Sequence, residues 1–270
     1  MGELDGKVAI VTGAGRMRGI GRAAANALAK AGANVVVTGT GRDPATFPAD
    51  EKAAHWGDID SVAKEVRAHG RKALPLVSNA NDPVQVQAVI DRTARDFGRI
   101  DILINNAAAA LGADRVPVVD LSDELFRKVV EVKLFGTFYY SRAVARYMIK
   151  QNQGGRIVNI SSTAGKRGAA NMAAYNAANF AVEGFTQALA KELAGYKITV
   201  NSVCPGLTDT SRMDSIKAAA NWEKRVADIP MGRPGTDAEV ADLIEFLCSP
   251  RAAFITGQGI NINGGALTER

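Results

Sequence analysis

The fold is decided by the stretch Val8-Ala9-Ile10-Val11-Thr12-Gly13-Ala14-Gly15-Arg16-Met17-Arg18-Gly19-Ile20-Gly21. It predicts a buried strand, then a glycine-rich turn, then the start of a helix. Glycines allow a tight turn and let the backbone come close to a pyrophosphate. The free N–H groups at the start of a helix favour an anion there. The stretch therefore predicts a phosphate-binding loop, and the plainer alternative is a glycine-rich turn without a ligand.

Outward from this loop, short apolar runs alternate with longer amphipathic ones. The predicted strands are Val8–Val11, Val35–Thr38, Ala73–Val77, Ile100–Ile104, Ile157–Ile160, Ile198–Val203 and Gly259–Ile262. The predicted helices are Ile20–Ala31, Asp60–His69, Val84–Phe97, Asp123–Lys150, Ala173–Ala194 and Ala238–Leu247. Regular alternation of this kind predicts an α/β fold, a doubly wound, Rossmann-type parallel sheet flanked by helices on both faces. Ligands of such sheets bind at the carboxyl ends of the strands.

We expect residues 1–270 to form a single dinucleotide-binding catalytic domain, because no linker or internal repeat divides the chain. Two segments are longer than the fold requires. Residues 39–57 follow the second predicted strand and form a loop insertion, and residues 207–230 follow the sixth and are expected to form a lid over the substrate.

The composition is that of an ordinary globular protein, with 47% apolar and 23% charged residues. No apolar run approaches the roughly 20 residues of a membrane span. The N-terminus is acidic and lacks the regions of a signal peptide. We therefore expect a cytoplasmic protein that does not bind a membrane, with Cys204 and Cys248 as reduced thiols.

The net charge of +5 raises the question of nucleic-acid binding, but the basic residues are scattered among acidic ones. A solvated surface of mixed charge is the better interpretation, and we expect no nucleic-acid partner. His55 and His69 are the two histidines, and they stand apart from each other in the sequence. We predict no metal site from them.

Further motifs make the chain resemble the short-chain dehydrogenase/reductase family of the single-domain type, including the 3-oxoacyl-carrier-protein reductases. Besides the glycine-rich loop, they are Asn105-Asn106-Ala107-Ala108, Pro205-Gly206 with Thr208 and Thr210, Ile255-Thr256-Gly257-Gln258, and Asn263-Gly264-Gly265. The family's loop has three residues between Thr-Gly and Gly-x-Gly, whereas five separate Gly13 from Gly19 here. The resemblance covers essentially the whole chain. It implies a nicotinamide-dependent oxidoreductase.

The resemblance also implies which residues contact the cofactor. Asn79 and Ala80 stand where the family has an Asp and an apolar residue beside the adenine. The full predicted set of cofactor-binding residues is Gly13, Arg18, Gly19, Ile20, Gly21, Gly39, Thr40, Arg42, Asn79, Ala80, Asn106, Ala107, Ala108, Tyr175, Asn179, Pro205, Gly206, Thr208 and Thr210.

The end of the second predicted strand favours one cofactor over the other. An NAD-binding site usually has a carboxylate there, which bonds the ribose hydroxyls and would repel a 2′-phosphate. Here the strand continues into Gly39-Thr40-Gly41-Arg42. Arg18 and Arg42 offer charge-assisted bonds to a phosphate, unless both are surface residues. We therefore favour NADP(H), with NAD(H) as the alternative.

The predicted catalytic pair is Ser162 and Tyr175. Ser162 ends the fifth predicted strand, and Tyr175 follows 13 residues later, early in a helix. In the family, the equivalent Ser hydrogen-bonds the substrate oxygen and the Tyr is the general acid/base. A strand-end cap and a core aromatic are the plainer interpretation of the two residues.

Two positions depart from the family pattern. The family has a Lys four residues after the Tyr, where this chain has Asn179, and an Asn on the preceding long helix, where this chain has Lys133. A tyrosine with an ordinary pKa near 10 is a poor base at neutral pH, and a nearby cation is the direct remedy. We predict that Lys133 and Asn179 have exchanged roles. The alternative is a nucleotide-binding pseudoenzyme.

The expected substrate is a small carbonyl compound or alcohol, of unspecified identity. Residues expected near it are Ala107 to Ala110, Thr163, Arg167, Asn171 and Leu207. The helices predicted over Asp123–Lys150 and Ala173–Ala194 carry apolar residues on more than one side. An apolar face left over after sheet packing is usually buried against a partner. We therefore expect a homo-oligomer, a tetramer as the family resemblance implies.

Overall fold

The computed structural model describes residues 2–217 and 222–269. Seven parallel strands form the central sheet, in the order β3-β2-β1-β4-β5-β6-β9. They are β1 (Val8–Val11), β2 (Asn34–Gly39), β3 (Ala73–Val77), β4 (Ile102–Asn105), β5 (Gly155–Ile160), β6 (Ile198–Pro205) and β9 (Gly259–Ile262). The predicted doubly wound parallel sheet is confirmed.

The strand order reverses beside β1, which pairs with β2 on one side and β4 on the other. Ala9 lies opposite Val35 in β2 and opposite Ile102 in β4. All four residues of β1 are buried, because helices cover both faces of the sheet. After β1 and β4 the chain leaves the sheet in opposite directions, which opens a crevice at the carboxyl ends of these two strands. Doubly wound sheets bind their ligands in this crevice.

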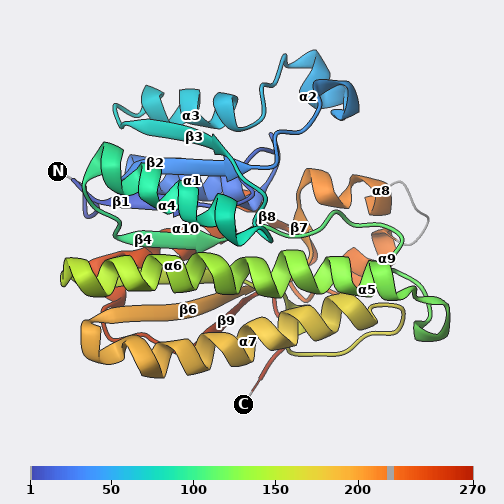
Figure 1. Ribbon diagram of the computed structural model, residues 1–270. Helices are drawn as coiled ribbons and strands as arrows, with labels where there is room; N and C mark the ends of the chain where they lie inside the picture. The colour runs from blue at the N-terminus through green and yellow to red at the C-terminus, as the bar shows by residue number, and fades with distance from the viewer. Residues whose placement is uncertain (1, 218–221, 270) are drawn as a thin grey trace.

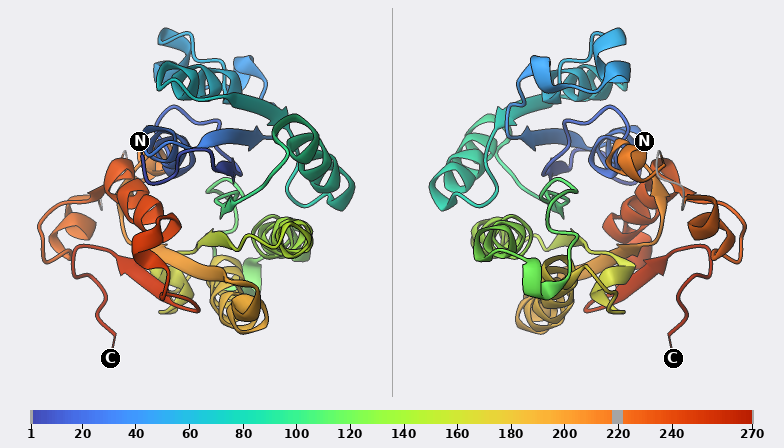
Figure 2. Two further views of the ribbon diagram at one scale, coloured as in Figure 1. Left: turned by 90° about the vertical axis from the view of Figure 1, so that its left-hand side faces the viewer. Right: turned by 90° about the vertical axis from the view of Figure 1, so that its right-hand side faces the viewer.

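Helices pack on both faces of the sheet in two layers (Figures 1 and 2). One layer contains α1 (Ile20–Lys30), α3 (Ile59–Ala68) and α10 (Asp237–Cys248). The other contains α4 (Pro83–Phe97), α6 (Gly136–Gln151) and α7 (Ala173–Leu193). A short helix, α5 (Asp123–Val130), leads toward α6 and packs on α7.

One of the predicted helices is not continuous in the structure. The segment predicted as a continuous helix from Asp123 to Lys150 is divided into α5 and α6 by a π-helical turn over Glu131–Phe135. A π turn widens the helix by one residue and redirects the side chains that it contains. Hydrophobic periodicity does not reveal such a turn, and Lys133 lies within it.

The two long segments contain short elements of their own. The first holds a 3-10 turn (Pro44–Thr46) and α2 (Ala49–Ala53). The second begins with β7 (Thr208–Asp209), which pairs with β8 (Gly235–Thr236), and continues into α8 (Asp214–Lys217) and α9 (Trp222–Ala227). Residues 218–221 lie within the predicted lid and outside the described residues.

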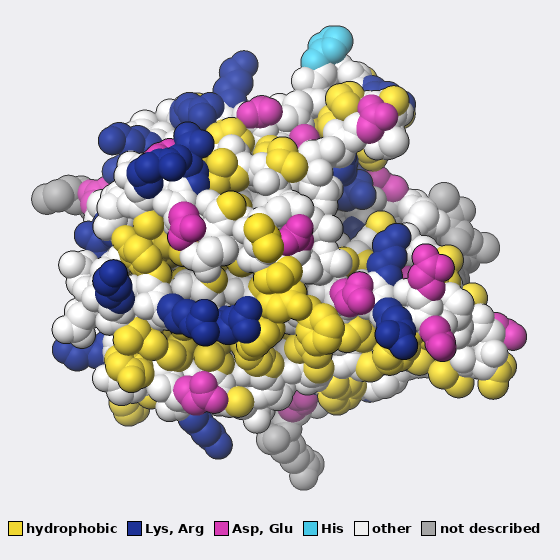
Figure 3. All heavy atoms as spheres, viewed as in Figure 1, with side chains coloured by type: hydrophobic (Ala, Val, Ile, Leu, Met, Phe, Trp, Pro, Cys, Tyr) yellow, Lys and Arg dark blue, Asp and Glu magenta, His cyan; other side chains and the backbone are white. Residues whose placement is uncertain are grey.

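The surface over α6 and α7 is rich in hydrophobic side chains (Figure 3). Phe135 and Phe180 are 43% and 46% exposed. Cys204 and Cys248 are buried and free. Among the helices of the described residues, none is long and apolar enough to cross a membrane.

Candidate active site

A cavity of about 660 Å³ opens at the carboxyl ends of the central strands. It extends from the glycine-rich loop after β1 to Tyr175 on α7. Every residue predicted to contact cofactor or substrate oxygen lines this cavity except Asn179. Of the residues expected near the substrate, Ala107 to Ala110 line it, whereas Thr163, Arg167, Asn171 and Leu207 do not.

The glycine-rich loop is fixed to the loop that follows β4. The Thr12 hydroxyl accepts hydrogen bonds from the backbone N–H groups of Asn106 and Ala107, at 3.0 and 3.1 Å. The Asn106 amide donates in return to the carbonyls of Thr12 and Gly13, both at 2.9 Å. Gly13 has a φ of +65°, and a Cβ there would come within 2.8 Å of the Ala107 backbone. Glycine is therefore required at this position.

The start of α1 is open to the cavity. Gly19 is the N-cap residue and has no side chain to cap the helix, and Gly19, Ile20 and Gly21 all line the cavity. The first N–H groups of a helix have no partner within the helix and carry its positive dipole end. These residues fit the pyrophosphate of a dinucleotide, and the cavity has the size and position for the rest of such a cofactor.

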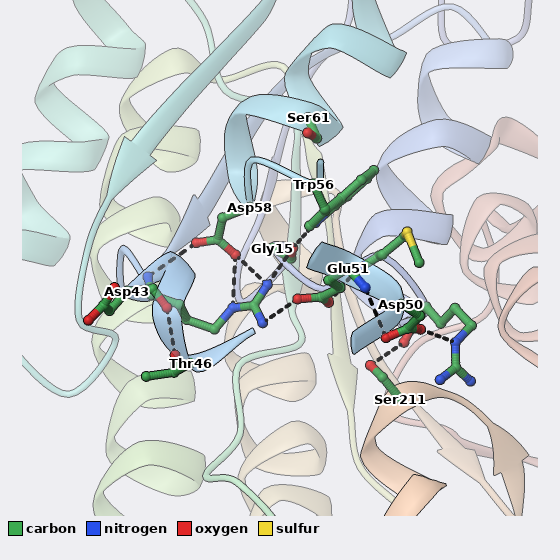
Figure 4. A network of polar contacts seen from close by, with 12 residues as sticks. Gly15, Asp43, Thr46, Asp50, Glu51, Trp56, Asp58, Ser61 and Ser211 are labelled. Atoms are coloured by element: carbon green, nitrogen blue, oxygen red, sulfur yellow. Dashed lines mark hydrogen bonds and ion pairs between the residues drawn. The ribbon is translucent and has the colours of Figure 1, made fainter. Parts of the chain in front are cut away.

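The insertion folds back onto the glycine-rich loop through ionic and polar contacts, in which Gly15, Glu51 and Asp58 take part (Figure 4). The Arg42 guanidinium donates to Asp58 Oδ1 at 2.8 Å and to Glu51 Oε2 at 2.8 Å. It also donates to the Gly15 carbonyl at 2.9 Å. The Glu51 side chain is fully buried and accepts a further bond from the Met17 backbone N–H. Arg42 thus lines the cavity but is already held by two carboxylates.

Arg18 is engaged in a similar way. Its guanidinium pairs with Asp50 of the insertion and with Asp214 of segment 207–230. The Arg18 carbonyl also accepts a hydrogen bond from Ser211 N–H at 3.0 Å. The longer loop therefore joins the insertion to segment 207–230, which the sequence pattern alone did not indicate.

Arg16 also belongs to this end of the cavity, although it was not among the predicted site residues. It lines the cavity close to Arg42 and Arg212 and forms no ion pair within the described part of the chain. Burial lowers its pKa, and the charge of Arg42 lowers it further. A cation in this position is suited to bind an anion that enters the cavity.

Ser162 and Tyr175 face the same cavity from two different elements. Ser162 follows β5, and its hydroxyl oxygen accepts a hydrogen bond from Ala164 N–H at 3.1 Å. The hydroxyl hydrogen is not used in this contact and is free to donate to a ligand. Tyr175 lies in the first turn of α7, with the guanidinium groups of Arg115 and Arg212 near its ring.

Lys133 and Asn179 lie in buried positions on neighbouring helical segments. The π turn directs the Lys133 ammonium to the carbonyl of Ile160, at the end of β5. Burial, together with the nearby charge of Arg212, lowers the pKa of Lys133 to about 7. The Asn179 amide donates to the Tyr175 carbonyl at 2.8 Å, and its Oδ1 atom is buried without a partner. Lys133 lines the cavity, whereas Asn179 supports the helix behind Tyr175.

A buried polar chain supports this end of the site. Asn105 on β4 donates to Asn159 on β5 at 2.8 Å and to Ser141 on α6 at 2.9 Å. Asn159 donates in turn to Thr186 on α7 at 2.8 Å. Buried groups that are bonded in this way fix the relative position of strands and helices. These hydrogen bonds therefore hold α6 and α7 in register with β4 and β5.

The fold and the site define a class of protein: a doubly wound sheet with an open glycine-rich loop and a Ser–Tyr pair in one cavity. The model of the family described as enoyl-(acyl carrier protein) reductase matches residues 13–267. A 3-oxoacyl-[acyl-carrier-protein] reductase of Vibrio cholerae is 38% identical over 266 residues, which are 97% of this chain and 98% of that protein. The corresponding reductase of Synechocystis is 39% identical over 266 residues, 98% of each chain.

Solved structures agree with this assignment. The acetoin dehydrogenase of Enterobacter cloacae superimposes with a TM-score of 0.79 and is 35% identical, covering 96% of this chain and 95% of its own. A short-chain type dehydrogenase/reductase of Mycobacterium marinum has a TM-score of 0.83 and 32% identity, covering 97% and 96%. The chain belongs to the short-chain dehydrogenase/reductase family and is an NAD(P)-dependent oxidoreductase.

Proposed function

We propose that this protein is an NADP(H)-dependent carbonyl reductase or alcohol dehydrogenase in which Tyr175 transfers the proton. The observation that carries the proposal is the single cavity shared by the phosphate loop, Ser162 and Tyr175. When bound in this cavity, a nicotinamide cofactor would supply a hydride to the carbonyl carbon in reduction or accept one from the alcohol carbon in oxidation. Tyr175 donates a proton to the carbonyl oxygen in reduction and accepts it in oxidation. The Ser162 hydroxyl donates a hydrogen bond to the same oxygen, which stabilises its developing negative charge.

Lys133 is proposed as the charged group that replaces the family's lysine. Its position in the cavity wall and its bond to the Ile160 carbonyl, two residues before Ser162, support this role. A pKa of about 7 means that Lys133 changes protonation near neutral pH. Groups with such pKa values are suited to pass protons. Lys133 therefore acts as a proton-carrying group behind the Ser–Tyr pair.

The preference for NADP(H) rests on the arginines that line the cavity around the glycine-rich loop. Arg16 is the strongest candidate for the 2′-phosphate, because Arg18 and Arg42 already bind carboxylates. Thr40 lines the same region and adds a hydroxyl donor. The competing cofactor is NAD(H), since Asp58 also lines the cavity and can accept bonds from ribose hydroxyls.

The proposed assembly is a homotetramer formed through α5, α6 and α7. Exposed phenylalanines on this face support it, together with an aromatic group in which Phe138 packs edge-on against Phe185 at 6.1 Å. A contiguous apolar face of this kind is typical of an interface between subunits.

The test of the proposed function measures NADPH oxidation with a panel of ketones, aldehydes and oxo acids, and NADPH binding in parallel. Tyr175→Phe should lower kcat by about 10²- to 10⁴-fold and leave the NADPH Kd unchanged, because the phenol acts on the proton and not on cofactor binding. Equal activity of the parent and Tyr175→Phe proteins would contradict the assigned role.

The second candidate function is a nucleotide-binding pseudoenzyme. The observation that favours it is Asn179, which stands at the family's lysine position and turns back to the Tyr175 carbonyl. A parent protein that binds NADPH but reduces no carbonyl, and gains turnover with Asn179→Lys, would establish this alternative.

A further inference from the structure

Two guanidinium groups from separate parts of the chain converge on the ring of Tyr175. The Arg115 Cζ atom lies 4.1 Å from the ring centre, and the Arg212 Cζ atom lies 5.6 Å from it. Arg115 belongs to the loop between β4 and α5, and Arg212 belongs to the 3-10 turn before α8. Neither residue was predicted from the sequence, because no motif surrounds them.

The hydrogen-bonding capacity of both groups is largely unused. The Arg115 side chain is 20% exposed, and its Nε and Nη1 atoms are buried without a hydrogen-bond partner. Its nearest carboxylate oxygen, on Asp114, lies at 3.5 Å from Nε. Arg212 donates from Nη1 to the Ala109 carbonyl at 2.6 Å and pairs with no carboxylate among the described residues. A buried arginine with free donors is costly unless an acceptor arrives.

The charges that line the cavity also favour an anionic ligand. Among the described residues that line it, Asp58 is the one carboxylate, and it is bound to Arg42. At the end near Tyr175, the cavity is lined by Lys128, Lys133 and Arg212. Burial lowers the pKa of Arg115, and the charge of Arg212 lowers it further despite the opposing effect of Asp114. An anion at this end would be attracted by several cations at once.

We propose that the substrate carries an anionic group, a carboxylate or a phosphate, which Arg115 and Arg212 bind while its carbonyl oxygen meets Ser162 and Tyr175. This proposal rests on the proposed function and specifies its substrate class. Arginine is suited to the task, because its planar fork matches carboxylate and phosphate oxygens in a bidentate manner. The phosphates of the cofactor belong at the other end of the cavity, on the glycine-rich loop.

The experiment compares matched pairs of substrates with NADPH. Pyruvate, acetoacetate and levulinate are each measured beside their methyl esters, and dihydroxyacetone phosphate is measured beside dihydroxyacetone. The proteins are the parent, Arg115→Met, Arg212→Met and the control Arg127→Met, whose arginine is exposed on α5 and does not line the cavity. The acid pairs and the phosphate pair distinguish the two kinds of anion.

The parent should have a kcat/KM at least about tenfold higher for one anionic substrate than for its neutral counterpart. Replacing either Arg115 or Arg212 should lower kcat/KM for the anion by about 10- to 100-fold, mainly through KM, because a charge-assisted bond contributes about 1.5–3 kcal/mol. The neutral counterpart and the Arg127→Met protein should be little affected. Neutral substrates preferred over anions, or equal losses for both in the variants, would overturn the proposal.

A binding measurement separates this proposal from the proposed function. Malonate, succinate and inorganic phosphate are titrated onto the enzyme–NADPH complex, and the fluorescence of bound NADPH is followed. Anion binding that Arg115→Met and Arg212→Met abolish would support the anion site even if no carbonyl is reduced. Reduction of neutral carbonyls without any arginine-dependent anion binding would overturn the anion site and leave the proposed function standing.

Discussion

Arg16 differs from the neighbouring arginines in having no carboxylate partner among the described residues, which leaves it available to bind a phosphate. Arg16, Arg18, Arg22 and Arg42 line the cavity around the glycine-rich loop. Arg18 is held by Asp50 and Asp214, Arg22 by Glu65, and Arg42 by Glu51 and Asp58. An arginine that already pairs with carboxylates has little net charge to offer a phosphate. Arg16 keeps its charge for a ligand, so the discrimination between cofactors should depend on it.

Arg16→Ala should raise the Kd for NADPH by about 10- to 100-fold, the loss expected when a charged hydrogen bond to phosphate is removed. The Kd for NADH, which has no 2′-phosphate, should change little. Fluorescence titration of both cofactors measures this. Arg18→Ala is the control and should have a smaller effect on the ratio of the two Kd values. Tighter binding of NADH by the parent, with no response to Arg16→Ala, would reject NADP(H) preference.

Lys133 should reduce the stability of the folded protein, because its ammonium is buried and poorly solvated. Its folded pKa of about 7 is below the ordinary value, so the unfolded chain binds more protons above pH 7. The parent therefore gains stability as pH rises from about 7 toward 10. Lys133→Met should be more stable than the parent at pH 6, and this advantage should shrink by about 2–3 kcal/mol at pH 9.

Thermal or urea unfolding of the cofactor-free proteins at both pH values measures this difference. Lys128→Met is a suitable control, because Lys128 is exposed. An advantage of Lys133→Met that is the same at pH 6 and pH 9 would show that Lys133 does not titrate in this range.

The same lysine should be needed for turnover. Lys133→Met removes the group that titrates near pH 7, so kcat should fall, and an inflection near pH 7 in the parent's pH–rate profile should disappear. Lys133→Asn alone should also be poorly active, whereas Lys133→Asn combined with Asn179→Lys restores the family arrangement and should recover activity. A parent-like rate and pH profile in Lys133→Met would leave Lys133 without a catalytic role.

At the scale of elements, the insertion acts on the glycine-rich loop through a few buried charges. Its short helix α2 brings Glu51 between the Met17 N–H and the Arg42 guanidinium, at 2.9 and 2.8 Å. The Trp56 indole adds a bond to the Gly15 carbonyl at 2.7 Å. The lengthened loop would otherwise be free to adopt several conformations, and fixing it reduces the entropy lost when a dinucleotide binds.

Glu51→Gln should therefore lower both stability and cofactor affinity. Removing the buried carboxylate that pairs with Arg42 should cost about 1–3 kcal/mol, with Asp58 retaining part of the interaction. The NADPH Kd should rise severalfold, because the loop is less ordered before binding. Lys52→Gln in the same helix is the control, since Lys52 is exposed. A stable Glu51→Gln protein with unchanged Kd would show that the insertion does not order the loop.

The long elements could be predicted from the sequence because hydrophobic periodicity specifies them. β1 and β3 were predicted with their observed bounds, and the ends of α1 and α7 differ by one residue. The short elements α2, α8 and α9 could not be predicted, since helices of four to six residues have no periodic apolar face. They are stabilised by tertiary contacts such as those of Glu51, which no local pattern reveals.

The residues of the candidate site also include some that could be predicted from the sequence and some that could not. Motif residues such as Gly13, Ser162 and Tyr175 were predicted, because their spacing along the chain repeats a known arrangement, and they line one cavity. Arg115 and Arg212 could not be predicted, because they are far apart in sequence and meet only in the folded chain. The carboxylates that pair with Arg18 and Arg42 could not be predicted either, because they meet these arginines only in the folded chain.

At the scale of the whole molecule, the face formed by α6 and α7 remains largely apolar (Figure 3). Phe138 and Tyr139 contact each other on α6, and the Arg142 guanidinium covers the Phe138 ring at 4.6 Å. Phe135 and Phe180 are left nearly half exposed beside them. Burying such rings contributes about 25 cal/mol per Å² of apolar area, which favours association of identical faces about a two-fold axis.

The proposed tetramer should form at micromolar concentration, with this face as one of its interfaces. Phe180→Glu places a charge on the apolar face and should produce smaller species, because an unpaired carboxylate in an interface is strongly unfavourable. Val84→Glu is the matched control: Val84 is 76% exposed, lies at the start of α4 and should leave the assembly unchanged. Sedimentation velocity, with circular dichroism to verify folding, measures both. A monomeric parent protein would contradict the proposed assembly. A Phe180→Glu protein that remains a tetramer would show that the interface lies elsewhere.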